Sequence, residues 1–190
     1  MNPTGAFSYL VGTLIDLYIT AVMLRLLLQF VKADFYNPVC QFLVRITNPL
    51  LIPLRRVIPG IGQLDTASVV LMLILEVFGV WFVSQISPVT MDWPTILVFS
   101  VTKLLMTLLW TYFFLIIAMV ILSWVGARAT HPIVPLVFQL TEPVLRPLRR
   151  VIPPIGGIDL SPLFALIGIR FLLLLLGFRT PRRPGGACKK

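Results

Sequence analysis

Four apolar stretches dominate the chain, and each is long enough to cross a lipid bilayer as a helix. They cover roughly residues 7–31, 67–86, 96–125 and 161–178. A spanning helix needs about 20 predominantly apolar residues. The third stretch is longer, so we expect it to tilt or to begin outside the membrane near Lys103. The first stretch ends with Arg25 and Gln29 and is followed by Lys32, in place of a cleavage pattern, so it is predicted to be a retained helix.

The segment between the apolar stretches occurs twice. Residues 47–65 read TNPLLIPLRRVIPGIGQLD and residues 141–159 read TEPVLRPLRRVIPPIGGID, so an offset of 94 residues gives 13 identities in 19 positions. The same offset matches Tyr18 with Tyr112 and Leu28 with Leu122. Self-similarity at a fixed offset marks a duplicated unit. The sequence therefore predicts repeat 1 at residues 1–95, repeat 2 at 96–178 and a basic tail at 179–190.

Each motif is expected to interrupt its helix, because prolines lie at positions 49, 53 and 59 and again at 143, 147 and 153. Upstream of them, apolar residues at helical spacing predict a short helix on the bilayer surface. These residues are Val39, Phe42, Leu43 and Ile46, matched by Val134, Val137, Phe138 and Leu140. The predicted fold class is an all-α integral membrane protein with four transmembrane helices in two parallel repeats. Each repeat has a short interfacial helix and a Pro/Gly/Arg motif loop between its two spans.

The composition supports a membrane protein and predicts its orientation. Hydrophobic residues make up 58% of the chain, charged residues 12%, and the mean hydropathy is +0.97, whereas soluble domains are about 25% charged. Basic residues gather in the two motif connections, which predicts that these connections are cytoplasmic, although the basic tail opposes this orientation. The net charge of +9 is assigned to anionic lipid headgroups rather than to nucleic acid, because the basic residues flank the apolar stretches.

Two interpretations of the motif remain open. In the first, its arginines bind phosphate headgroups, and its aspartates cap helices or pair with the arginines. In the second, the two motifs converge into one polar site for an ion, an anionic group or a partner, because irregular backbone at membrane depth must be buried in protein or line a cavity. The candidate site residues are Arg55, Arg56, Gly62, Asp65, Arg149, Arg150, Gly156 and Asp159.

Charged residues inside the apolar stretches are a second candidate site. They are Asp16, Arg25, Glu76 and Arg170. Such residues are costly in lipid and mark functional positions. The repeat offset makes Glu76 and Arg170 equivalent, so we hypothesise that they form an ion pair at the repeat interface, with Arg25 as the competing partner of Glu76. The pair could fix the register of the two halves or take part in ion passage, and both roles remain open.

Enzyme chemistry is not expected. The sequence lacks the G-x-S-x-G, Walker, H-E-x-x-H and G-x-G-x-x-G motifs. His131 is equivalent to Asn37, and both precede a proline, which favours a turn-forming role over a metal site. Cys40 and Cys188 have no counterparts in the other repeat and are interpreted as free thiols. No metal and no cofactor are predicted.

The duplicated P-L-R-R-V-I-P-x-I-G-x-x-D, and especially R-R-V-I-P-P-I-G-G-I-D-L-S-P at residues 149–162, resembles the signature of the YggT family of small integral membrane proteins. The resemblance covers nearly the whole chain and implies a two-repeat protein of the bacterial inner membrane. The first copy departs from the second at Gln63, Thr66 and Ala67, so a role of the first motif is less secure.

The resemblance implies two alternative functions. One is a contribution to osmotic stress tolerance through cation or potassium uptake, by the protein alone or as a homo-oligomer. The other is a scaffold or assembly factor that binds membrane protein partners and anionic lipids, in cell division and nucleoid distribution or in cytochrome and haem assembly. Access of water to Glu76 distinguishes them, because an ion path needs a hydrated carboxylate and a scaffold leaves it dry and paired.

Overall fold

The computed structural model is helical throughout its described residues, which are 3–60, 65–86, 91–125, 131–152 and 159–177. The helices follow in the order α1 (Pro3–Phe30), α2 (Pro38–Val57), α3 (Thr66–Ile86), α4 (Trp93–Val125), α5 (Ile133–Val151) and α6 (Ser161–Gly177). Helices α1, α3 and α4 are long and apolar enough to cross a membrane, and α6 is a shorter apolar helix. An all-helical protein of membrane composition is thus confirmed, while the basic tail lies outside the described residues.

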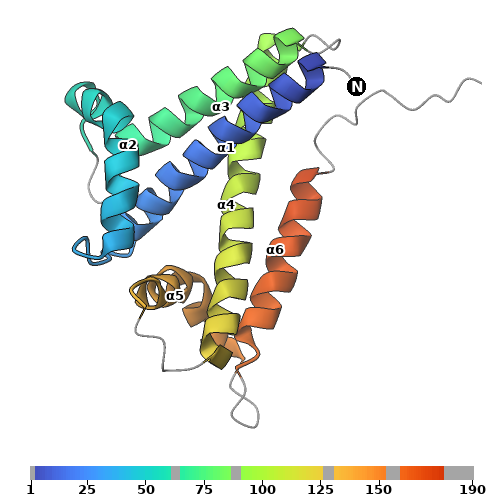
Figure 1. The fold of residues 1–190 in the computed structure, drawn as a ribbon. Coiled ribbons are helices and arrows are strands. Elements are labelled where there is room, and N and C mark those ends of the chain that lie inside the picture. The colour runs from blue at the N-terminus through green and yellow to red at the C-terminus, as the bar shows by residue number, and fades with distance from the viewer. Residues whose placement is uncertain (1–2, 61–64, 87–90, 126–130, 153–158, 178–190) are drawn as a thin grey trace, which may run out of the picture.

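The two repeats have the same helix order and similar packing. In each repeat a long helix leads to an amphipathic helix, and an apolar helix then returns along the first (Figure 1). Helix α1 packs on α2 and α3, and α4 packs on α5 and α6. The repeats meet mainly where α3 packs on α4. Helix α4 begins at Trp93, next to the predicted boundary after residue 95.

The connection from α1 to α2 is defined by two end motifs. Lys32 adopts a left-handed conformation with φ of 53°, and the Ala33 N–H donates to the Leu28 carbonyl at 2.9 Å, which satisfies an end carbonyl of α1. Asn37 Oδ1 then accepts from the Val39 N–H at 2.9 Å, with Pro38 in the first turn of α2. At the equivalent position in repeat 2, His131 Nδ1 accepts from the Ile133 N–H at 3.4 Å. The predicted turn-forming role of this pair of positions is confirmed.

The prediction that the prolines interrupt the motif helices is wrong for four of them. Helix α2 continues through Pro49 and Pro53, and α5 continues through Pro143 and Pro147. All four prolines are exposed. The carbonyls that lose an amide donor therefore lie on the outer face, while the inner face stays helical and packed. The ribbon of α2 changes direction along its length (Figure 1), and the helix ends at Val57, before Pro59.

The apolar residues of α2 include a buried set and an exposed set. Buried residues recur along one face of the helix: Cys40, Leu43, Thr47 and Leu51. Of the residues on the predicted apolar face, Leu43 is buried in the protein, whereas Phe42 is 62% exposed. The polar Thr47 is tolerated inside because its hydroxyl donates to the Leu43 carbonyl at 2.7 Å, within its own helix. Helix α2 thus has an inner face packed on the protein and a second, outer set of exposed apolar residues.

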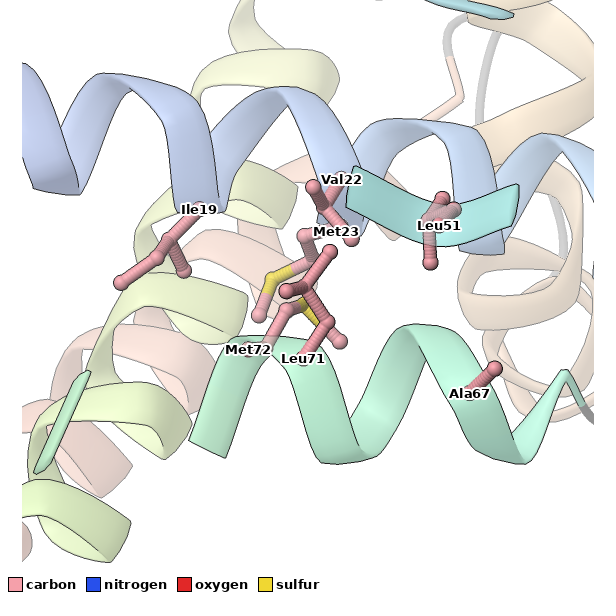
Figure 2. Close-up of a cluster of buried hydrophobic side chains, with 7 residues drawn as sticks. All are labelled: Ile19, Val22, Met23, Leu51, Ala67, Leu71 and Met72. Atoms are coloured by element: carbon pink, nitrogen blue, oxygen red, sulfur yellow. The ribbon is translucent and has the colours of Figure 1, made fainter. Parts of the chain in front are cut away.

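The core of repeat 1 lies between α1 and α3 and is closed at one end by α2. Figure 2 shows its seven buried side chains, which are Ile19, Val22, Met23, Leu51, Ala67, Leu71 and Met72. Repeat 2 has a corresponding cluster that includes Ile116, Leu145, Ala165 and Ile169. A third cluster joins Cys40 and Leu43 of α2 to Leu136 and Leu140 of α5. The amphipathic helices therefore share one buried cluster, which also includes Leu28 of α1.

Candidate functional site

The first motif forms an ion pair across the turn between α2 and α3. Arg55 Nη2 lies 2.5 Å from Asp65 Oδ2, and the Ser68 hydroxyl donates to the same oxygen at 2.5 Å. Burial would raise the pKa of Asp65, but the hydrogen bonds from Arg55 and Ser68 and the charge of Arg55 outweigh it and hold the pKa below its usual value. The pair fastens the end of α2 to the start of α3.

The second motif forms the equivalent pair. Arg149 Nε donates to Asp159 Oδ2 at 2.8 Å, and its Nη1 donates to Glu142 at 3.0 Å. Asp159 Oδ1 accepts from the Ser161 N–H at 2.9 Å, as a helix cap does. Burial opposes ionisation, but the bonds from Ser161 and Arg149 lower the pKa of Asp159. Pairing of the motif aspartates with the arginines and capping by Asp159 agree with the first interpretation of the motif.

The other motif residues divide into two groups. Arg56 and Arg150 are exposed at the ends of α2 and α5, and neither has an ion pair within the described part of the chain. Gly62 and Gly156 lie outside the described residues. Every described motif ion pair is formed within one repeat.

A cluster of three charged side chains lies between α1, α3 and α4. Lys103 Nζ lies 2.5 Å from Asp16 Oδ1 and 2.7 Å from Glu76 Oε1. The Glu76 side chain is 1% exposed and the Asp16 side chain 44% exposed. The buried Glu76 Oε2 has no hydrogen-bond donor among the described residues. The cluster brings together one ammonium and two carboxylates contributed by both repeats.

The predicted ion pair between Glu76 and Arg170 is wrong. Glu76 faces Lys103, whereas the Arg170 guanidinium carbon lies 5.7 Å from the centroid of the Trp110 ring. Helix α6 packs on α4 and α5, while α3 packs on α1, α2 and α4, so the equivalent side chains point into different helix contacts. Repeat equivalence alone does not make two residues meet, because it does not say which faces of the repeats are joined.

Arg25 is not the competing partner of Glu76 either. Its side chain is buried, and Nη1 donates to the Thr47 hydroxyl at 2.5 Å. The repeat offset places Met119 at the equivalent position of α4, where it is buried in the apolar cluster of repeat 2. The first repeat therefore contains a buried cation where the second has a thioether.

Lys103 is the residue that sequence reasoning missed. The length of the third apolar stretch suggested that this lysine lies near the membrane boundary, yet it is half-buried and holds two carboxylates from other helices. The usable signal was its position inside an apolar run, because an intramembrane lysine normally pairs with an acid. Asp16 and Glu76 were the acids in the other stretches.

The cluster has the chemistry of a site for one small cation. With all three groups ionised, one ammonium faces two carboxylates, which leaves one negative charge in an apolar surrounding. Such a charge is costly unless it is neutralised. A proton or one monovalent cation at the open Glu76 oxygen would neutralise it. The described residues contain no group of three or more His, Cys, Asp or Glu side chains arranged to hold a metal ion.

Comparison with known proteins decides the family. The model of the CCB3/YggT family matches residues 4–86 and again 98–179, so it covers each repeat once. The chain belongs to the CCB3/YggT family. The duplication and the motif resemblance are thereby confirmed for this CCB3/YggT-family chain. No solved structure matches it.

Several bacterial relatives share the family and nearly the full length. An uncharacterized protein of Pseudomonas aeruginosa is 41% identical over 183 residues, which cover 90% of this chain and 88% of the relative. An uncharacterized protein of Vibrio alginolyticus is 40% identical over 178 residues, which cover 91% of this chain and 94% of the relative. The uncharacterized protein YggT of Escherichia coli K12 is 38% identical over 165 residues, which cover 86% of this chain and 85% of the relative. These relatives establish kinship and assign no activity.

Proposed function

We propose that this CCB3/YggT-family protein is a non-enzymatic protein of the bacterial inner membrane that contributes to osmotic stress tolerance by supporting the uptake of a monovalent cation, with potassium as the first candidate. The observation that carries the proposal is the buried Glu76 carboxylate, which has one oxygen on Lys103 and the other without a donor among the described residues. An unsatisfied carboxylate oxygen between apolar helices is suited to bind and release a small cation.

The proposal includes four membrane spans. Helix α6 has 17 residues, which is at the lower end of the range for a spanning helix. It runs back along α4 as α3 runs along α1, so a membrane that contains α1, α3 and α4 would also contain α6 (Figure 1). Helices α2 and α5 then lie at the same membrane surface, with the exposed Arg56 and Arg150 facing anionic headgroups on the cytoplasmic side.

The test is potassium flux into proteoliposomes that contain the purified protein. Flux is expected for the wild type and is expected to disappear in Glu76→Gln, which keeps the shape of the side chain and removes its charge. Asp34→Asn is the control, because Asp34 is an exposed carboxylate between α1 and α2 that belongs to neither the cluster nor the motifs. Absence of flux from folded wild type would refute cation uptake by the protein alone.

The alternative function is a scaffold or assembly factor for membrane proteins, including cell division or cytochrome and haem assembly. The exposed Arg56 and Arg150 at corresponding helix ends favour it, because each is a cation that forms no ion pair with a described carboxylate. Water access distinguishes the two functions. A Glu76→Cys thiol, in a chain with Cys40→Ala and Cys188→Ser, would react with a water-soluble thiol reagent if a path reaches it and would stay unreactive in a scaffold.

A further inference from the structure

One face of α3 is covered in this protein, while the equivalent face of α6 is open. Met72, Glu76 and Val80 follow one another at four-residue spacing on α3 and are all buried. The repeat offset matches them with Leu166, Arg170 and Leu174 on α6. Arg170 is exposed and Leu174 is 54% exposed. The difference arises because α4 lies against α3, whereas α6 has no corresponding helix on that side within the described chain.

The face of α4 that covers α3 also has an open equivalent. Ile96 and Ser100 are buried, and Lys103 reaches Glu76 across this contact. The offset matches Ser100 with Ala6 and Lys103 with Tyr9 on α1. Ala6 is exposed and Tyr9 is 76% exposed. The α3 and α4 faces therefore pack on each other between the repeats. The equivalent faces, on α6 and α1, are both exposed.

We propose that a second copy of this chain docks on α6 through the Ala6–Tyr9 face of its α1 and so repeats the contact between α3 and α4. In this arrangement Tyr9 of the second copy lies against Arg170, as Lys103 lies against Glu76. Because the joined surfaces differ, the contact is heterologous, and further copies can add in the same sense until a ring closes.

The chemistry of the open faces supports this occupant rather than lipid. Arg170 lies among exposed apolar residues of α6, and a cation there is costly if it faces hydrocarbon. Asp16 and Glu76, which hold Lys103 in repeat 1, are equivalent to Trp110 and Arg170. The Trp110 ring already lies 5.7 Å from the Arg170 guanidinium carbon. Tyr9 of the second copy would supply a second aromatic ring and enclose the cation between two π faces.

Cross-linking of two differently tagged copies in one membrane tests the proposal. One copy contains Tyr9→Cys and the other Arg170→Cys, both with Cys40→Ala and Cys188→Ser, and a short bismaleimide joins thiols at side-chain distance. In the control, the second copy contains Leu172→Cys and keeps Arg170. Leu172 is also exposed on α6, and its equivalent Phe78 remains exposed on α3 although α4 packs there. Leu172 should therefore lie outside the contact.

The proposal expects severalfold more mixed dimer from the Tyr9 and Arg170 pair than from the Tyr9 and Leu172 pair, with little product from either single variant alone. Equal yields from both pairs, or strong self-linking of the Arg170→Cys copy, would overturn it, since self-linking indicates a symmetric contact instead. A Leu174→Cys copy paired with Tyr9→Cys keeps Arg170 intact. A mixed dimer from neither this pair nor the Arg170→Cys pair would also overturn the proposal.

Discussion

Lys103 Nζ of the second repeat lies 2.7 Å from Glu76 Oε1 of the first, so this ion pair between the repeats is made by residues that are not repeat equivalents. The positions equivalent to Asp16 and Glu76 are occupied by Trp110 and Arg170, which also contact each other. The two repeats therefore have different chemistry at these equivalent positions. In repeat 1 the two carboxylates bind Lys103 of repeat 2, whereas in repeat 2 the Arg170 guanidinium lies over the Trp110 ring.

The Lys103 and Glu76 pair should show strong energetic coupling. Removal of one partner from a buried pair costs about 3–5 kcal/mol when it leaves an uncompensated buried charge. Lys103→Met leaves the buried Glu76 carboxylate without its cation and is expected to destabilise the protein markedly, whereas Glu76→Gln leaves a partly exposed Lys103 still paired with Asp16 and is expected to cost less. Unfolding of the single and double variants in micelles measures the coupling, which should fall within about 0.5–3 kcal/mol. Additive losses would contradict a direct interaction.

The Arg55 and Asp65 pair should make stability depend on acid. The pKa of folded Asp65 lies below its usual value, so the folded state favours the ionised carboxylate. This stabilisation is fully present above the unfolded pKa of about 3.9 and is lost as the pH falls through the folded value. Asp65→Asn should therefore reduce stability near neutral pH and flatten the acid side of the thermal unfolding profile. Asp34→Asn, at an exposed aspartate of the same repeat, should leave that profile unchanged.

Arg25 should be replaceable by methionine without loss of the fold. Repeat 2 packs Met119 at the equivalent position, and Thr47 keeps its bond to the Leu43 carbonyl without Arg25. Replacing a buried charge by an apolar residue of similar volume is often neutral or stabilising. We expect Arg25→Met to change the free energy of unfolding by less than about 1 kcal/mol and Arg25→Ala, which leaves a cavity, to cost about 2 kcal/mol or more. A large loss in Arg25→Met would show that the cation itself stabilises the fold.

Gly79 should tolerate alanine and reject leucine. A Cβ atom at Gly79 would lie 3.4 Å and 3.6 Å from two atoms of Ile15, which is close contact without severe overlap. Gly79→Ala is therefore expected to be near neutral, since the helical preference of alanine offsets the tighter packing by up to about 1 kcal/mol. Gly79→Leu should separate α1 from α3 and cost about 1–3 kcal/mol. Leu173, the equivalent residue, is buried in repeat 2, so the matched Leu173→Gly variant should lose stability by leaving a cavity.

The sequence alone predicted the four apolar helices and the two repeats. Apolar runs of spanning length predicted α1, α3, α4 and α6 to within a few residues, because burial in lipid demands continuous hydrophobicity. The duplicated motif identified the repeats, and each Arg and Asp pair lies only ten residues apart in the chain. Each pair joins the end of one helix to the start of the next, so a short connection is enough to bring the two residues together.

Only the tertiary structure decided which charges meet between helices. An apolar helix exposes no sequence pattern that distinguishes a lipid-facing side from a protein-facing side, because both are hydrophobic. The sequence therefore could not show that Lys103 reaches Glu76 or that Arg170 faces outward beside Trp110. Only the structure showed that α2 and α5 continue through their prolines. Packing of the inner face keeps these segments helical although proline locally favours a break.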